Sequence, residues 1–253
     1  MSLGKDWQSL SKEHNDLKSR FSKLAGHKLT DQNPDLSDPS DPNRAMKLSD
    51  KFGALYDDAW TDAFEHLTGK QKQNPRDVIQ FLLERLKDCW ESCKKVADTW
   101  KESLKHKFLH PVQDNDAMSK MAGEKMKLRL GSKEQRLVGD ACLKIAPTVG
   151  VLVKQYFITQ MKTNKLTNDC LTYLEGCVDV CWLMVFAEPP LHIDFNIKQG
   201  DKFDPNRHTA YSSSGETVEF LVWPPLYNAL DGGGMLLSKG TVSTERKIVK
   251  QRK

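Results

Sequence analysis

A double proline, Pro189-Pro190, separates two hydrophobic patterns that predict different secondary structures. Upstream, apolar residues recur every three or four positions, which is the spacing of an amphipathic helix. Downstream, apolar and polar residues alternate in Leu191–Ile197 and Val218–Val222, which is the spacing of a strand, and Met235–Val242 is a third candidate strand. The chain is therefore expected to be mainly α: a multi-helix bundle with a small C-terminal β element.

Capping residues, glycines and prolines divide the helical part into predicted helices. Ser49 or Asp50 is expected to cap a first helix, which ends at Gly69. The pair Asn74-Pro75 has the residue types of an N-cap and a first helical position, and it opens a long helix whose apolar residues keep a helical spacing until Pro111.

Three further helices are expected after this one. A short one covers residues 118–130. The next begins after Ser132 and bends or breaks at Pro147, because proline cannot donate the backbone hydrogen bond of a helix. The last begins at Asn168 and is apolar on nearly every side near its end, so it is predicted to be the central helix of the core.

The chain divides into four expected parts. Residues 1–28 carry a heptad-like seam, which predicts either a short coiled-coil-like helix or an ordinary amphipathic helix. Residues 29–47 are rich in Pro, Asp, Ser and Asn and are expected to be a flexible linker. A helical domain is expected at 48–245, followed by a basic tail at 246–253.

Bulk features exclude several classes of protein. No apolar run approaches the roughly 20 residues of a membrane-spanning helix, and the charged N-terminus has no signal-peptide core, which favours a cytoplasmic location. Five of the six cysteines lie four or seven residues from another cysteine, at Cys89/Cys93 and at Cys170/Cys177/Cys181, unlike the Cys-x2-Cys pairs of structural zinc sites. All six are predicted to be reduced, buried packing residues, and no metal or cofactor is expected.

Catalytic signatures are weak. His192 and Asp194 flank Ile193 on one strand face. This pattern is more typical of polar residues on the exposed face of a strand than of a hydrolase active site. The run Gly232–Gly234 lacks the spacing of a phosphate-binding loop and predicts a hairpin turn. The chain is therefore not expected to be an enzyme.

Basic residues are concentrated in the middle of the chain. Between Asn115 and Leu166 there are ten basic and four acidic residues, a net charge of +6, whereas the whole chain carries +4. A short helix with methionines on one side and lysines on the other is typical of a segment that binds an anionic membrane surface. A helix with its methionines in the core and its lysines in solvent has the same spacing. No base-reading motif is present, so nucleic acid is not an expected partner. The candidate lipid-binding residues are Lys120, Lys125, Lys127, Arg129, Lys133 and Arg136.

Several separated blocks of sequence resemble the C-terminal domain of the mitochondria-eating protein family. The resemblance covers about Leu48 to Val242. The blocks that carry it are Leu55-Tyr56-Asp57-Asp58-Ala59-Trp60-Thr61-Asp62-Ala63-Phe64, Cys181-Trp182-Leu183-Met184-Val185 running into Pro189-Pro190, Val222-Trp223-Pro224-Pro225, and Leu237-Ser238-Lys239-Gly240.

The resemblance implies a non-enzymatic role in mitochondrial quality control and mitophagy, with binding to the anionic lipid cardiolipin and scaffolding at the mitochondrion. It leaves open whether the outer membrane or the interior is contacted. Family members typically carry a coiled coil before this domain, and residues 1–28 resemble its remnant, so a homo-oligomer through the N-terminal helix is a further expectation. The alternative is a protein-interaction or homo-oligomerisation module that does not bind lipid directly.

Overall fold

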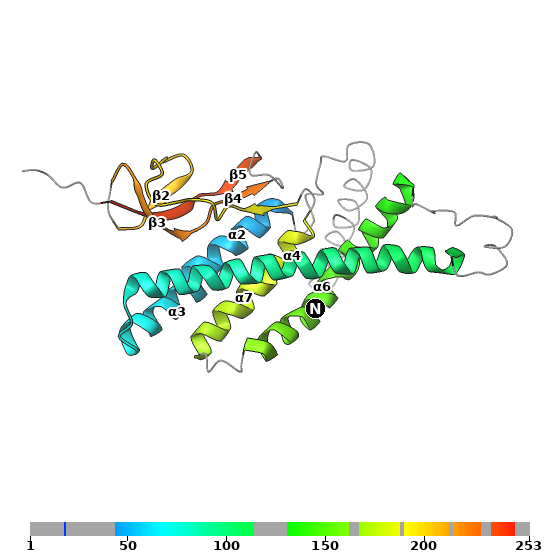
Figure 1. Ribbon diagram of the computed structural model, residues 1–253, viewed down its shortest axis with the longest axis horizontal. Helices are drawn as coiled ribbons and strands as arrows, with labels where there is room; N and C mark the ends of the chain where they lie inside the picture. The colour runs from blue at the N-terminus through cyan, green and yellow to red at the C-terminus, as the bar shows by residue number, and fades with distance from the viewer. Residues whose placement is uncertain are drawn as a thin grey trace, which may run out of the picture.

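The computed structural model describes Lys18 and residues 44–113, 131–161, 167–187, 190–212, 215–228 and 234–245. In the part of the chain that the structure describes, helices lie before residue 186 and strands follow, so the mainly helical fold with a small C-terminal β part is confirmed. Figure 1 shows α4 running the length of the molecule, with the other helices crossing it obliquely and the sheets gathered beside α2. The predicted parts at 1–28 and 246–253 and most of the predicted linker lie outside the described residues, apart from Lys18.

The first helical segment is continuous from residue 45 to residue 70 and contains two π-helical turns. It consists of α2 (Ala45–Leu55), η1 (Tyr56–Trp60), α3 (Thr61–Glu65) and η2 (His66–Lys70). The predicted caps Ser49 and Asp50 are wrong, because they lie inside α2, whose N-cap position is Arg44. Ala45, Met46 and Lys47 are good helix formers, so the helix begins before the capping residues. Gly69 does not end it either: the left-handed turn falls at Lys72, with φ 53°.

Helix α4 (Pro75–Gln113) begins where the sequence predicts. The Oδ1 atom of Asn74 accepts a hydrogen bond from the Arg76 N–H at 2.9 Å, so Asn74 caps the helix. The helix ends two residues after the predicted end at Pro111. A proline removes only one intrahelical hydrogen bond, so the last turn continues past it. At 39 residues, α4 is about 58 Å long.

Helix α6 (Ser132–Met161) is a single helix that contains Pro147, so the predicted break into two helices does not occur. Tertiary contacts hold both sides of the proline. Ala146 and Val153 are buried, and the Trp182 Nε1–H donates to the Ala146 carbonyl oxygen at 2.7 Å. Packing therefore keeps the helix continuous across the missing backbone hydrogen bond.

Helix α7 (Asn168–Val185) is the centre of the core, as predicted. It contacts α2, α4 and α6, and half of its 18 residues are buried. Thr167 caps it, because the side-chain oxygen accepts from the Cys170 N–H at 3.4 Å. The helix ends at Val185, before the double proline.

The C-terminal part forms two three-stranded sheets in place of one small β element. Their strand orders are β1-β4-β5 and β2-β6-β3. The single strand predicted at Met235–Val242 is wrong: Lys239 separates two strands that belong to different sheets. The strands are β1 (His192–Ile193), β2 (His208–Ala210), β3 (Val218–Trp223), β4 (Leu226–Asn228), β5 (Met235–Ser238) and β6 (Gly240–Thr244).

Aromatic side chains join the sheets to the helices. The Trp223 ring lies 4.6 Å from the Phe52 ring and 5.1 Å from the Tyr56 ring, measured between centroids. Val222, Trp223 and Leu226 belong to the same buried core as the helices, while Val218, Leu221 and Val242 form a second, smaller cluster. Register shifts in the β3–β6 pair divide the apolar residues of β3 between these two clusters.

Candidate functional site

The candidate lipid-binding residues fall mostly outside the part of the chain that the structure describes. This is the case for Lys120, Lys125, Lys127 and Arg129, which belong to residues 114–130. Arg136 lies on the backbone of α6, but its side chain is not described. Lys133 is exposed in the first turn of α6. The predicted basic surface therefore stays a prediction, with one of its members placed.

Helix α6 exposes a row of large apolar side chains to solvent. Their solvent-exposed fractions range from 43% at Ile145 to 67% at Leu137. At 100° per residue they fall within about 140° of the helix circumference and span about 28 Å along the axis. The row consists of Leu137, Ile145, Val151, Leu152 and Tyr156, and we refer to it as the α6 apolar face. Hydrophobic periodicity alone did not distinguish this face from the buried one.

Lysines line one edge of the α6 apolar face. Lys133 and Lys144 are exposed, and on a helical wheel they fall close to Val151 and Leu137. Asp140 is partly buried, and among the described side chains of α6 the exposed ones include no carboxylate. On the same wheel, Asp140 falls beside the two lysines, and the exposed Thr148, Gln155 and Thr159 fall among the apolar residues. The face therefore combines apolar, polar and positively charged side chains.

Contacts with α7 fix the rotation of α6 and so determine which face points outward. Besides its hydrogen bond to Ala146, the Trp182 ring lies so close to Gly150 that a Cβ atom there would be 2.7 Å from Trp182 Cδ1. The Lys154 ammonium contacts the Asp179 carboxylate at 2.7 Å. In Figure 1, α6 lies on the other side of α7 from α2 and the sheets.

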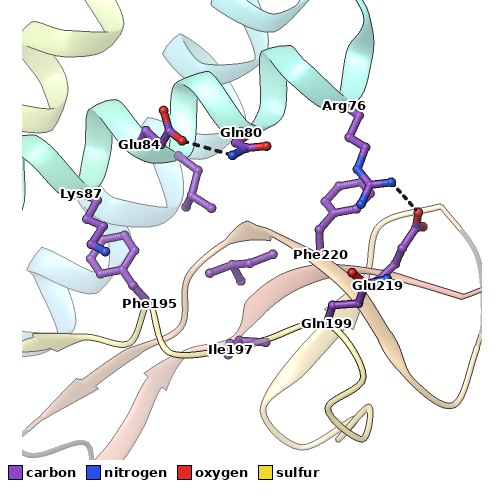
Figure 2. Close-up of a pocket in the computed structure, with 11 residues that line it drawn as sticks. Arg76, Gln80, Glu84, Lys87, Phe195, Ile197, Gln199, Glu219 and Phe220 are labelled. Carbon is purple, nitrogen blue, oxygen red and sulfur yellow. Dashed lines mark hydrogen bonds and ion pairs between the residues drawn. The ribbon is translucent and has the colours of Figure 1, made fainter.

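A groove of about 390 Å³ lies between α4 and the β part. Figure 2 shows Arg76 reaching from α4 over the Phe220 ring to Glu219, and Lys87 beside Phe195. The Arg76 guanidinium is 4.9 Å from the Phe220 ring centroid and 3.2 Å from the Glu219 carboxylate. The other residues that line the groove are Gln80, Leu83, Glu84, Ile197, Gln199 and Leu221.

The charges of this groove are balanced. Arg76 and Lys87 are opposed by Glu84 and Glu219, so the lining offers no excess of positive charge to a phosphate. Its apolar walls and mixed charges are more typical of a surface that contacts a peptide.

The weak catalytic candidates lie in the β part, where the Asp194 side chain makes structural hydrogen bonds. Asp194 accepts a hydrogen bond from Arg207 Nη2 at 3.2 Å and another from the Asn196 N–H at 2.9 Å. His192 is in β1, where it pairs with Tyr227 of β4. The predicted hairpin is confirmed by the antiparallel pairing of β4 and β5, although most of the Gly232–Gly234 turn lies outside the described residues.

The six cysteines are buried, as predicted, and carry free thiols. Burial raises the pKa of Cys93 to about 12 and raises the pKa values of Cys177 and Cys181 well above the ordinary value of a thiol. These thiols are therefore protonated near neutral pH. Among the described residues, no group of His, Cys, Asp and Glu side chains is arranged to hold a metal ion.

None of the described helices combines the length and the apolar character needed to cross a bilayer. In comparisons with known proteins, the family model described as mitochondria-eating protein (MIEAP) matches residues 44–244, which include every described helix and strand from α2 to β6. No curated protein and no solved structure matches the chain.

Proposed function

Because the chain belongs to the mitochondria-eating protein family, whose role is in mitochondrial quality control, we propose that it binds the anionic phospholipid cardiolipin and acts as a scaffold on mitochondrial membranes. Its function is then recognition of a membrane surface, without catalysis. A chain that acts this way is cytoplasmic and associates with mitochondria during mitophagy, at the outer membrane or inside the organelle.

One observation carries this proposal: the net charge of +6 between residues 115 and 166, in a stretch that continues into α6. Lys133 and Lys144 extend the positive charge onto the exposed surface of that helix. A basic residue near an anionic membrane contributes about 1 kcal/mol to binding, so a cluster of this size supports stable association. Cardiolipin supplies the phosphates that such a cluster attracts.

Flotation of the full chain with phosphatidylcholine vesicles, with and without cardiolipin, tests the proposal. We expect recovery with the cardiolipin vesicles and weaker binding when ionic strength is raised, because salt screens exposed charges. Replacing Lys120, Lys125, Lys127 and Arg129 by Glu is expected to abolish flotation. Equal recovery with both vesicle types, or full binding of the charge-reversed variant, would contradict the proposal.

The groove between α4 and the β part supports a second candidate function, a protein-interaction module. Half-buried Phe195, Ile197 and Phe220 line it beside charges of both signs, as at the surfaces that bind peptides. When the partner is a second copy of the chain, this candidate function makes the protein a homo-oligomer. Light scattering over a concentration series tests for this homo-oligomer, and a monomer at every concentration argues against it.

A further inference from the structure

We infer that α6 enters the membrane interface, lying in the plane of an anionic bilayer with its apolar face at the boundary between headgroups and acyl chains. This inference rests on the proposed function and assigns the contact to particular side chains. An amphipathic helix with apolar residues on one side and lysines beside them binds a bilayer in this orientation.

The exposed apolar residues of the described chain are concentrated on this one helix. Of eight exposed large hydrophobic side chains, five form the α6 apolar face. The other three, Met46, Tyr211 and Met235, come from α2, from the chain after β2 and from β5. Single exposed apolar residues are common on soluble proteins, whereas a contiguous row marks an interaction surface.

Charge identifies the occupant of this surface as an anionic bilayer. Lys133 and Lys144 lie at one edge of the face, and the basic segment that contains Lys120 to Arg129 directly precedes the helix. With Glu134 and Asp140 counted, residues 115–166 still carry a net charge of +6, which attracts phosphates.

The face is held in place and does not require the domain to unfold. The Trp182 hydrogen bond to Ala146 and the Lys154–Asp179 contact fix the buried side of α6 on α7. Burying large apolar side chains is favourable, so partial burial of five adds substantially to the attraction of the lysines. This apolar contribution is not screened by salt.

A fluorophore that is sensitive to polarity tests the insertion directly. Leu152→Cys places one reactive thiol on the face, and the six native cysteines are buried, so a maleimide dye labels the new position selectively. Asn206→Cys, in an exposed turn of the β part, is the matched control. With cardiolipin vesicles we expect a several-fold rise and a blue shift of emission at position 152 and no change at position 206.

Three results of this experiment would overturn the inference. The first is unchanged emission at position 152 under conditions in which the labelled chain floats with the vesicles. The second is emission that is already blue-shifted before vesicles are added, which means that another part of the chain covers the face. The third is a shift that follows protein concentration without lipid, which means that a second copy covers it.

Neutral substitutions separate insertion from charge attraction. The triple variant Leu137→Gln, Ile145→Gln and Leu152→Gln keeps every charge, and its positions are exposed, so folding is expected to be preserved. Partial burial of each side chain corresponds to about a tenfold change in partitioning per substitution. The control variant, Thr99→Gln with Ser103→Gln, changes exposed polar residues of α4, away from this face, and is expected to bind like the wild type.

The outcomes distinguish this inference from the proposed function. If the wild type floats with cardiolipin vesicles and the triple variant floats equally well, the inference is wrong and the proposed function stands. If the wild type floats with neither vesicle type, both are wrong. A loss in the triple variant with no loss in the control supports insertion through α6.

Discussion

At the scale of single residues, His208 is the clearest case of a group whose state depends on the fold. It is 6% exposed in β2, and neither ring nitrogen has a hydrogen-bond partner among the described atoms. Burial lowers the pKa of His208, and the neighbouring Arg207 lowers it further, while Asp204, Asp194 and Asp201 act in the opposite direction. The folded chain therefore favours the neutral imidazole.

We predict that the free energy of unfolding falls as the pH drops below the unfolded-state pKa of histidine, about 6.5. Because the folded pKa is lower, the unfolded chain binds more protons in the interval between the two pKa values, and this shifts the equilibrium toward unfolding. Urea unfolding midpoints at about pH 7 and about pH 5 measure the effect. His208→Gln should show a smaller difference between the two, and an equal difference would exclude His208 as its source.

At position 150, the Trp182 ring leaves no room for a side chain. An added Cβ atom would lie 2.7 Å from Trp182 Cδ1 and 3.0 Å from Trp182 Nε1, in a ring that is 1% exposed and hydrogen-bonded to Ala146. Gly150→Ala should destabilise the fold by about 1–2 kcal/mol, since overpacking outweighs the gain in helix propensity. Chemical denaturation measures this loss.

Gly139 provides the matched control for Gly150 on the same helix. An added Cβ atom there meets nothing within 4 Å, so Gly139→Ala should stabilise the fold by up to about 1 kcal/mol. If both variants gain stability, the tight contact between Gly150 and Trp182 does not constrain α6.

At the scale of elements, three of the four sequence blocks that resemble the family come together in space. Trp223 and Pro225, of the block that precedes β4, contact Gly240 at the start of β6. Trp223 also packs on Tyr56, and Tyr56 packs on Trp60, both from the first helical segment. The blocks thus mark the junction at which the two sheets meet α2 and η1.

We predict that Gly240→Ala disrupts this junction. Its Cβ atom would lie 2.6 Å from Pro225 Cδ and 2.9 Å from the Trp223 carbonyl oxygen, and the backbone atom cannot move aside as a flexible side chain can. The loss should be about 2–3 kcal/mol, measured by urea unfolding. Gly53→Ala, in α2 with nothing within 4 Å, should cause no loss. A harmless Gly240→Ala would mean that the strands rearrange freely at this point.

At the scale of the whole molecule, one core spans both kinds of structure. Val222, Trp223 and Leu226 from the sheets are buried together with residues of α2, α4 and α7. The smaller cluster of Val218, Leu221 and Val242 also contacts α4 through Leu83. Neither sheet has a separate core large enough to fold alone.

We therefore predict that the helices and the sheets unfold in one transition. Native-state hydrogen exchange with increasing urea should give peptides from α7 and β3 the same limiting free energy of opening. Exchange of the β3 peptides at much lower urea, with α7 still protected, would show that the sheets open independently and that Trp223 does not couple them to the helices.

Local rules account for what could be predicted. The change from helical to strand period, the Asn74 cap, the start of α7 at Asn168 and the burial of the cysteines follow from spacing and side-chain chemistry within a few residues. The family resemblance also came from the sequence. The basic candidates from Lys120 to Arg136 stay a prediction, because charge pattern alone does not say which residues share a surface.

Only the tertiary structure decided how these local elements combine. Helix α6 continues through Pro147 because Trp182 contacts it on both sides of the proline, at Ala146 and at Gly150. The segment Met235–Val242 is divided between two sheets. The tertiary structure also placed Leu137, Ile145 and Leu152 in solvent, although they are as hydrophobic as the residues that α6 buries. A sequence determines which side chains prefer to leave water, whereas the packing of α6 on α7 determines which of them can.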